Sequence, residues 1–329
     1  MNKVLFSNDQ GTISQCHVTD DMSLLIIESA TCNAKVSLYG GQVLQWQPQG
    51  HEDVFWLSDK AIYEQGTAIR GGVPVCWPWF GAFPEGMDLM NHDPKEKISS
   101  HGFARVSLWQ IEEIDVTAKG ATIKLSISGE NAHPAWPFKF ELNQTLFFGE
   151  SFSQTLSMKN ISNEGKPSGQ YANDRINTRS DTNNLLAQYT GALHSYFAVG
   201  AANDTKIENL TGVPFDDKIK ISGQYEISED KLSPVTSCEG PIDRIYSSNK
   251  DLLIVDKGNN RTIKLHAENT QQWVLWNPGI EIASSMKDVH LNGEKEFVCL
   301  EAANTELMSL PVGETVSISQ HISVEHHVS

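Results

Sequence analysis

Short runs of alternating apolar and polar residues dominate this sequence and constrain its fold more than any other feature. The runs are rich in Val, Ile, Thr and Phe, and Gly, Asn or Asp separate them. Alternation with a period of two is typical of strands with one buried face. The clearest examples are MSLLIIES (22–29), ATIKLSIS (121–128), FELNQTLFF (140–148), SFSQTLSMKN (151–160), LLIVDKG (252–258), RTIKLHAEN (261–269), QQWVLWNPG (271–279) and TVSISQHISVE (315–325).

Long amphipathic helical patterns are almost absent. A succession of strands without intervening helices predicts an all-β protein, built as a large antiparallel β-sandwich. GNN at 258–260 predicts a hairpin turn between two strands. We expect a single domain over residues 1–329 with a polar, turn-rich insertion at about 163–184. An insertion of this length is either a lid over a binding site or a neutral surface loop.

The net charge and the cysteine content indicate which kinds of partner the protein can bind and in which cellular compartment it functions. The net charge of −16 argues against non-specific binding to nucleic acid or anionic membranes, although a few arginines can still bind a small anion. The five cysteines are scattered without a CxxC pair, which favours a reducing compartment. No signal-peptide run and no stretch of about 18 apolar residues occurs. We therefore expect a cytoplasmic monomer without a nucleic-acid or membrane partner.

Two ionisable residues lie in apolar surroundings. His194 is in ALHSYFAVG (192–200), where it is either a core histidine with satisfied nitrogens or a group that moves protons. The spacing alone favours the core histidine. Glu301 follows FVCL in KEFVCLEAAN (295–304), which places it at the end of an apolar strand. A buried carboxylate without a partner is costly, so Glu301 is a functional candidate.

The stretch AIRGGVPVCWPWFG (68–81) is the densest unusual segment. The two glycines after Arg70 allow a sharp turn or a close approach to a ligand. Trp77, Trp79 and Phe80 offer flat apolar faces that suit a sugar ring, or they form a rigid aromatic corner of the core.

Further charged candidates lie in SSHGFARVSLWQ (99–110) and GPIDRIYSS (240–248). Arg105, like Arg70, has a planar guanidinium that matches a phosphate or carboxylate, or pairs with acids at the surface. Asp243 lies near a strand start, where a turn or capping role is favoured. No metal-ligand spacing, GxGxxG, Walker loop or GxSxG motif occurs, so we expect no metal and no cofactor.

Six motifs, taken in order, resemble those of a known family. RGGVPVCWPWFG, HGFAR, LHSYFAVG, IDRIY, WNPG and FVCLEAA are similar to motifs of the glucose-6-phosphate 1-epimerases, the hexose-6-phosphate mutarotases of the aldose 1-epimerase superfamily. The resemblance runs from about residue 35 to the C-terminus. It implies a large antiparallel sandwich of the galactose-mutarotase type, in agreement with the strand pattern.

The resemblance also implies a reaction and a catalytic pair. The α and β anomers of a hexose 6-phosphate, with D-glucose 6-phosphate as the expected substrate, would interconvert by ring opening and closure. His194 would be the general acid and Glu301 the general base. This chemistry moves one proton from O1 and one to the ring oxygen O5, and it requires neither metal nor nicotinamide.

The same resemblance implies the substrate contacts. Arg70 and Arg105 would hold the phosphate, and His101 and Asp243 would meet the sugar hydroxyls. Ser100 occupies a pocket-lining position at which relatives commonly have Gln.

Three alternatives stay open at this stage. The first is a non-catalytic sugar or sugar-phosphate binding protein of the same fold, which would not need both His194 and Glu301. The second is an epimerase for neutral sugars, which would have little use for two convergent arginines. The third is a glycosidase or lyase, which would need a carboxylate pair where this sequence offers one convincing base.

Overall fold

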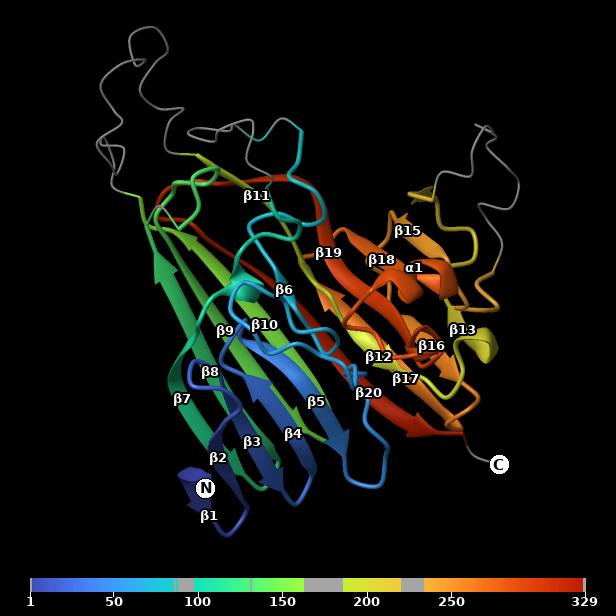
Figure 1. The fold of residues 1–329 in the computed structure, drawn as a ribbon, viewed down its shortest axis with the longest axis horizontal. Coiled ribbons are helices and arrows are strands. Elements are labelled where there is room, and N and C mark those ends of the chain that lie inside the picture. Colours follow the sequence, from blue (N-terminus) through green and yellow to red (C-terminus); the bar gives the residue numbers. More distant parts are fainter. Residues whose placement is uncertain are drawn as a thin grey trace, which may run out of the picture.

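The structure is a computed structural model that describes residues 2–85, 87, 98–130, 132–162, 186–219 and 234–327. Strands make up most of this part of the chain, and they gather into layered sheets (Figure 1). Neighbouring strands in these sheets pair antiparallel, which confirms the all-β antiparallel prediction. The predicted insertion at about 163–184 lies outside the described residues.

The largest sheet has eight strands. In spatial order they are β13 (Thr205–Glu208), β16 (Leu252–Asp256), β17 (Arg261–Glu268), β20 (Thr315–His326), β10 (Ser151–Asn160), β9 (Phe140–Gly149), β8 (Gly120–Gly129) and β7 (Gln110–Thr117). The predicted turn at 258–260 joins β16 to β17 as an antiparallel hairpin, so that prediction is confirmed.

Two smaller sheets cover this large one. The first is a meander of β1 (Lys3–Asn8), β2 (Gly11–His17), β3 (Ser23–Ser29), β4 (Cys32–Ser37) and β5 (Gln42–Pro48). The second contains, in order, β14 (Phe215–Asp217), β15 (Ile242–Tyr246), β18 (Gln272–Asn277), β19 (Phe297–Leu310), β11 (Ala187–Leu193) and β6 (Val75–Cys76), and β12 (Tyr196–Ala198) also pairs with β19.

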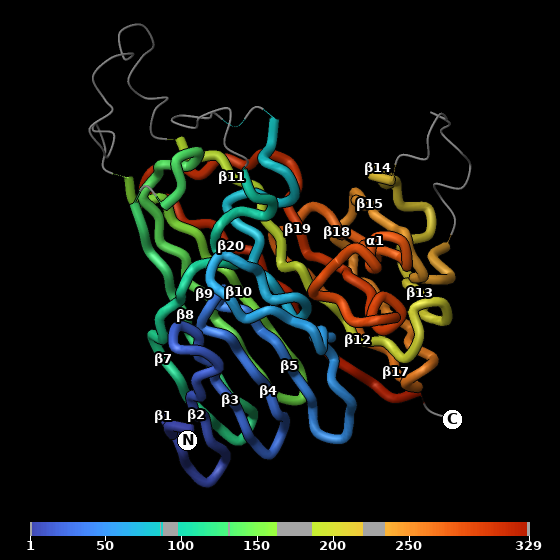
Figure 2. The backbone as a smooth tube through the Cα atoms, viewed as in Figure 1, coloured from blue at the N-terminus to red at the C-terminus, as the bar shows by residue number. Residues whose placement is uncertain are grey.

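The layers are held together by one extensive apolar core. Strands β3 and β4 contact β8 and β9, and the tube view shows this part of the meander lying in front of the large sheet (Figure 2). On the other side of the molecule, Leu275 and Leu300 share a core cluster with Ile263 and Ile322 of the large sheet. Alternate residues of β18 and β19 therefore point into the core, and their neighbours point to the opposite face of the sheet.

Helices are few and short within the described ranges. The α-helix α1 (Gly279–Ser285) follows β18, and 3-10 helices occur at Ala104–Val106, Ala202–Asp204 and Gly293–Lys295. None of the helices in the described part of the chain has the length and apolar character needed to cross a membrane.

Candidate active site

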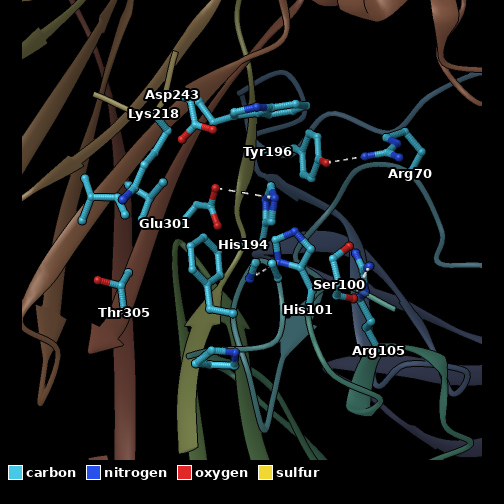
Figure 3. Close-up of a pocket in the computed structure, with 17 residues that line it drawn as sticks. Arg70, Ser100, His101, Arg105, His194, Tyr196, Lys218, Asp243, Glu301 and Thr305 are labelled. Atoms are coloured by element: carbon cyan, nitrogen blue, oxygen red, sulfur yellow. Dashed lines mark hydrogen bonds and ion pairs between the residues drawn. The ribbon is translucent and has the colours of Figure 1, made fainter. Parts of the chain in front are cut away.

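A cavity of about 600 Å³ lies on the face of the β15–β18–β19 sheet that points away from the main core. Figure 3 shows the side chains that line it. The register of the three strands places four lining residues on this face, because Asp243 pairs with Trp276 and Val274 pairs with Glu301. All seven residues predicted for the site line this cavity: Arg70, Ser100, His101, Arg105, His194, Asp243 and Glu301. A second hollow of about 500 Å³, lined by Asn209, Thr211, Lys250 and Asp251, contains none of them.

Glu301 lies within a strand and not at its end, so that part of the prediction is wrong. Strand β19 continues after Glu301 as far as Leu310, because β18 pairs with it up to Ala303 and β11 pairs with it, with one irregularity, from Ala302 to Leu310. Leu300 and Ala302 point into the main core. The alternation therefore directs the Glu301 side chain into the cavity, where it is 1% exposed.

His194 follows directly after β11, and hydrogen bonds of its own backbone and of the next residue hold it in place. The backbone N–H of His194 donates to the carbonyl of Pro74 at 3.1 Å. The next residue, Ser195, donates from Oγ to Oε1 of Gln320 at 2.9 Å. Gln320 donates in turn to Gln154 at 2.7 Å, and Gln154 donates to Gln144 at 2.6 Å. This buried chain ties the histidine segment to the large sheet.

His194 and Glu301 form a close, buried pair. Nε2 of the imidazole lies 3.5 Å from Oε1 of the carboxyl group. The remaining polar atoms, Nδ1 of His194 and Oε2 of Glu301, have no hydrogen-bond partner among the described residues. Most buried polar atoms in proteins are paired, so two orphaned atoms in one cavity are typical of a site that binds a polar ligand.

Burial disfavours charge on both members of the pair. It lowers the pKa of His194 well below its ordinary value, and the positive charges of Arg105 and Arg70 act in the same direction, as protonation of His101 would. Burial raises the pKa of Glu301 well above its ordinary value, aided by the carboxylate of Asp243 and opposed by Arg105. Burial therefore favours a neutral imidazole beside a protonated carboxyl group.

Two aromatic residues that the sequence analysis did not assign to the site enclose the histidine. The ring of Tyr196 lies parallel to that of His194, with centroids 4.8 Å apart. Trp276 presents its edge at 6.0 Å. Both residues belong to the quoted motifs LHSYFAVG and WNPG. The period of two would have suggested Tyr196, which lies two positions after His194 at the start of β12.

The two arginines differ in their partners. Arg70 donates from Nε to Oδ2 of Asp288 at 3.0 Å and from Nη1 to the hydroxyl of Tyr196 at 2.9 Å. Arg105 donates from Nη2 to the carbonyl of Ser100 at 2.9 Å, and its buried Nε has no partner in the described structure. Both arginines lie on the same side of His194 in Figure 3. Ser100 thus lines the cavity and anchors Arg105 through its backbone.

His101 is held as a neutral hydrogen-bond donor. The N–H of Gly81 donates to Nδ1 of His101 at 3.2 Å, which leaves the ring proton on Nε2. Burial, with Arg105 and Arg70, lowers the pKa of His101 to about 3. The next residue, Gly102, has φ of 66°, and a Cβ there would lie 2.0 Å from the carbonyl oxygen of Trp77. Only glycine fits beside His101 at this close contact.

Asp243 and Lys218 lie on the other side of His194 (Figure 3). Asp243 is within β15 and lines the cavity, so the turn or capping interpretation is wrong. Burial raises the pKa of its carboxyl group, and the nearby Lys218 lowers it. Lys218, which the sequence analysis did not select, also forms an exposed ion pair with Asp216.

The sugar-stacking interpretation of Trp77 and Trp79 is wrong. Both side chains are fully buried in the main core, as the alternative of a rigid aromatic corner predicted, whereas Phe80 does line the cavity. The two glycines after Arg70 have positive φ, but they approach backbone and not a ligand. A Cβ on Gly72 would lie 2.0 Å from the carbonyl oxygen of Val43.

Two properties of the described residues bear on cofactors and redox chemistry. No group of three or more His, Cys, Asp or Glu side chains in the described ranges is arranged to hold a metal ion. All five cysteines are free thiols, and four of them are buried.

Comparison with known proteins agrees with this architecture. Residues 22–168 and 175–323 match the aldose 1-epimerase family. A Salmonella typhimurium protein named "Putative glucose-6-phosphate 1-epimerase" is 30% identical over 86% of this chain and 83% of its own length. An Escherichia coli protein of the same name is 28% identical over 86% of this chain and 84% of its own.

A crystal structure of a "putative mutarotase" from Salmonella typhimurium has a TM-score of 0.77 to this chain at 27% identity. The alignment covers 99% of this chain and 97% of the other. The family match spans most of the sequence, and the sandwich and the motifs around the cavity agree with it. The chain therefore belongs to the aldose 1-epimerase family, whose members are isomerases.

Proposed function

We propose that the protein interconverts the α and β anomers of a hexose 6-phosphate, with D-glucose 6-phosphate as the first substrate to test. The observation that carries this proposal is the buried His194–Glu301 pair, whose orphaned atoms share one cavity with two arginines. The names of the relatives from Salmonella typhimurium and Escherichia coli point to the same substrate class.

In the proposed reaction, Glu301 accepts the proton of the anomeric hydroxyl O1 while His194 donates a proton to the ring oxygen O5. The C1–O5 bond breaks and O1 becomes the oxygen of an open-chain aldehyde. Rotation about the C1–C2 bond presents the other face of the aldehyde, and closure returns both protons. Each positioned acid or base contributes on the order of 10²–10⁴ in rate.

The protonation state of the pair is set by the substrate. One proton shared between Oε1 of Glu301 and Nε2 of His194 gives either a neutral pair or an ion pair. Burial favours the neutral pair when the cavity is empty. A phosphate dianion near Arg70 and Arg105 offsets the positive field that lowers the pKa of His194, and so favours the imidazolium needed as an acid.

The other polar residues provide the binding contacts of the proposed complex. The buried Nε of Arg105 has no partner among the described residues and can donate to a phosphate oxygen, and Arg70 adds a second cation. His101 has its proton on Nε2, so it can donate to a sugar hydroxyl. Asp243 can accept from a hydroxyl on the opposite side of the cavity. These contacts orient the ring so that O1 and O5 face the base and the acid.

Anomer exchange measured by NMR saturation transfer tests the proposal directly. We expect the protein to accelerate exchange between the two anomeric protons of glucose 6-phosphate and to act much more weakly on free glucose and free galactose. Faster turnover of free galactose would identify a neutral-sugar epimerase. Saturable binding of glucose 6-phosphate without acceleration would identify a binding protein.

A further inference from the structure

Three side chains from distant parts of the sequence form a hydrogen-bonded chain behind His194. Oδ2 of Asp288 accepts from Nε of Arg70 at 3.0 Å, and Nη1 of Arg70 donates to the hydroxyl of Tyr196 at 2.9 Å. The Tyr196 ring is stacked on the imidazole of His194 at an interplanar angle of 7° (Figure 3). The chain therefore runs from Asp288 to the face of the proposed acid.

The segment that carries Asp288 is itself held in place. Nε1 of Trp56 donates to Oε2 of Glu296 at 3.0 Å, and Nε2 of His290 lies 2.8 Å from the same oxygen. Nδ1 of His290 accepts from the backbone N–H of Asp59 at 3.3 Å, so Nε2 of this ring carries the proton that binds Glu296. These bonds dock the connection between α1 and β19 against the 56–59 segment and fix Asp288 beside Arg70.

The two arginines of the cavity therefore differ in whether a carboxylate compensates their charge. Asp288 compensates Arg70 across a pair whose side chains are only 14% and 26% exposed. Arg105 takes part in none of the ion pairs found among the described residues, and its Nη2 binds a neutral carbonyl. A guanidinium without a carboxylate partner attracts an anion more strongly than a compensated one.

We propose that Asp288 is a positioning residue, which holds Arg70 so that Arg70 fixes the Tyr196 ring against His194 and leaves Arg105 as the main phosphate-binding cation. This inference rests on the proposed function for the roles of His194 and the phosphate. Without Asp288, the long Arg70 side chain is free to turn toward a bound anion and release the Tyr196 hydroxyl. The stacked ring then loses the contact that orients it.

The proposal can be tested by two measurements that do not depend on catalytic turnover. The first is calorimetric titration with inorganic phosphate, and the second is the NMR spectrum of the His194 imidazole. In Asp288→Asn, the amide oxygen still accepts from Nε of Arg70, but the negative charge is gone. We expect phosphate to bind up to about fivefold more tightly, with the His194 resonances nearly unchanged.

In Asp288→Ala both the charge and the acceptor are lost. We expect tighter phosphate binding and displaced His194 resonances, because the ring current of Tyr196 changes at the imidazole. The kcat for anomer exchange should fall several-fold while KM does not rise. Glu325→Gln, which removes an exposed ion pair with Lys264 on the large sheet, is the matched control and should change none of these quantities.

Equal or weaker phosphate binding in Asp288→Asn would overturn the charge compensation. Unmoved His194 resonances in Asp288→Ala would overturn the positioning role. Tyr196→Phe provides a second variant if Asp288→Ala does not fold: it keeps the ring but loses the hydroxyl that Arg70 holds, so the resonances must move. If these shifts occur while the wild type does not convert hexose phosphates, the proposed function fails and the positioning role stands.

Discussion

Nε2 of His194 lies 3.5 Å from Oε1 of Glu301, although 107 positions separate the two residues in the sequence. The backbone after β11 supplies the histidine, and the interior of β19 supplies the glutamate. The antiparallel pairing of β11 with β19 brings Leu193 opposite Ala302. His194, which follows Leu193, therefore lies beside Glu301, which precedes Ala302. Sheet register therefore creates the proposed acid–base pair.

Removing either member of the pair should abolish most of the activity. We expect His194→Ala and Glu301→Gln each to slow anomer exchange of glucose 6-phosphate by at least about a hundredfold, because each variant loses one proton-transfer group. Binding of inorganic phosphate should change little, since neither residue is assigned to the phosphate. Saturation-transfer NMR measures the anomer exchange, and calorimetry measures the binding of inorganic phosphate. Near-wild-type exchange in both variants would remove the pair from the mechanism.

The raised pKa of Glu301 predicts a cost to stability at neutral pH. The unfolded chain releases this proton near pH 4.3, while the buried carboxyl group keeps it to higher pH. The contribution of this carboxyl group to the free energy of unfolding is therefore fully present below about pH 4.3 and decreases as the pH rises, by about 1.4 kcal/mol per pH unit until the folded group ionises.

Glu301→Gln removes this ionisation with little change of shape. We expect the variant to be more stable than the wild type at pH 7, with a difference that disappears near pH 4. Urea denaturation at several pH values measures the free energy of unfolding. Glu325→Gln, at an exposed ion pair, should show no such pH-dependent gain. A stability difference between Glu301→Gln and the wild type that stays constant with pH would contradict the burial argument.

Charge selectivity should depend more on Arg105 than on Arg70. A charge-assisted hydrogen bond contributes roughly 1.5–3 kcal/mol, so Arg105→Gln should raise KM for glucose 6-phosphate by about ten- to a hundredfold. Arg70→Gln should raise it less, because Asp288 already compensates that cation. KM for free sugars should be nearly unchanged in both variants. A larger effect of Arg70 on phosphate selectivity would reverse the assignment of the two cations.

The strands could be predicted from the sequence because their alternation is local. The pattern at 151–160, for example, matches β10 residue for residue. The predicted strand ends too early around Glu301 because Asn304 and Thr305 interrupt the apolar pattern, whereas pairing with β11 extends β19 as far as Leu310. The error over Trp77 arises because an indole has the same apolar surface whether it meets a sugar or the core, and only the fold decides which.

The site was only partly accessible to sequence reasoning. The predicted residues line one cavity, but it is the order of the family motifs that predicts them. The spacing of apolar residues alone favours a core role for His194. Asp288 gave no local signal, because it lies in irregular structure after α1 and meets Arg70 across 218 positions. Contacts of this kind follow from the docking of a connection onto the sheet, and no periodicity encodes them.

The empty and occupied cavities should differ in the pKa of His194. Burial is the largest cause of its lowered pKa, and the positive charges of Arg105 and Arg70 add to it, as protonation of His101 would. The low pKa of His101 keeps that imidazole neutral, and Glu301 and Tyr196 also face the His194 ring. An anion bound by the arginines cancels part of their positive field, so it should raise the pKa of His194.

Titration of the His194 imidazole by NMR, with and without inorganic phosphate, measures this change. We expect an upward shift on addition of phosphate, and a smaller one in Arg105→Gln, where the pKa of the empty site should already be higher. His266, an exposed histidine paired with Asp251 outside the cavity, is an internal control whose titration should not move. A downward or absent shift at His194 would show that phosphate binds too far from the imidazole to prepare it as an acid.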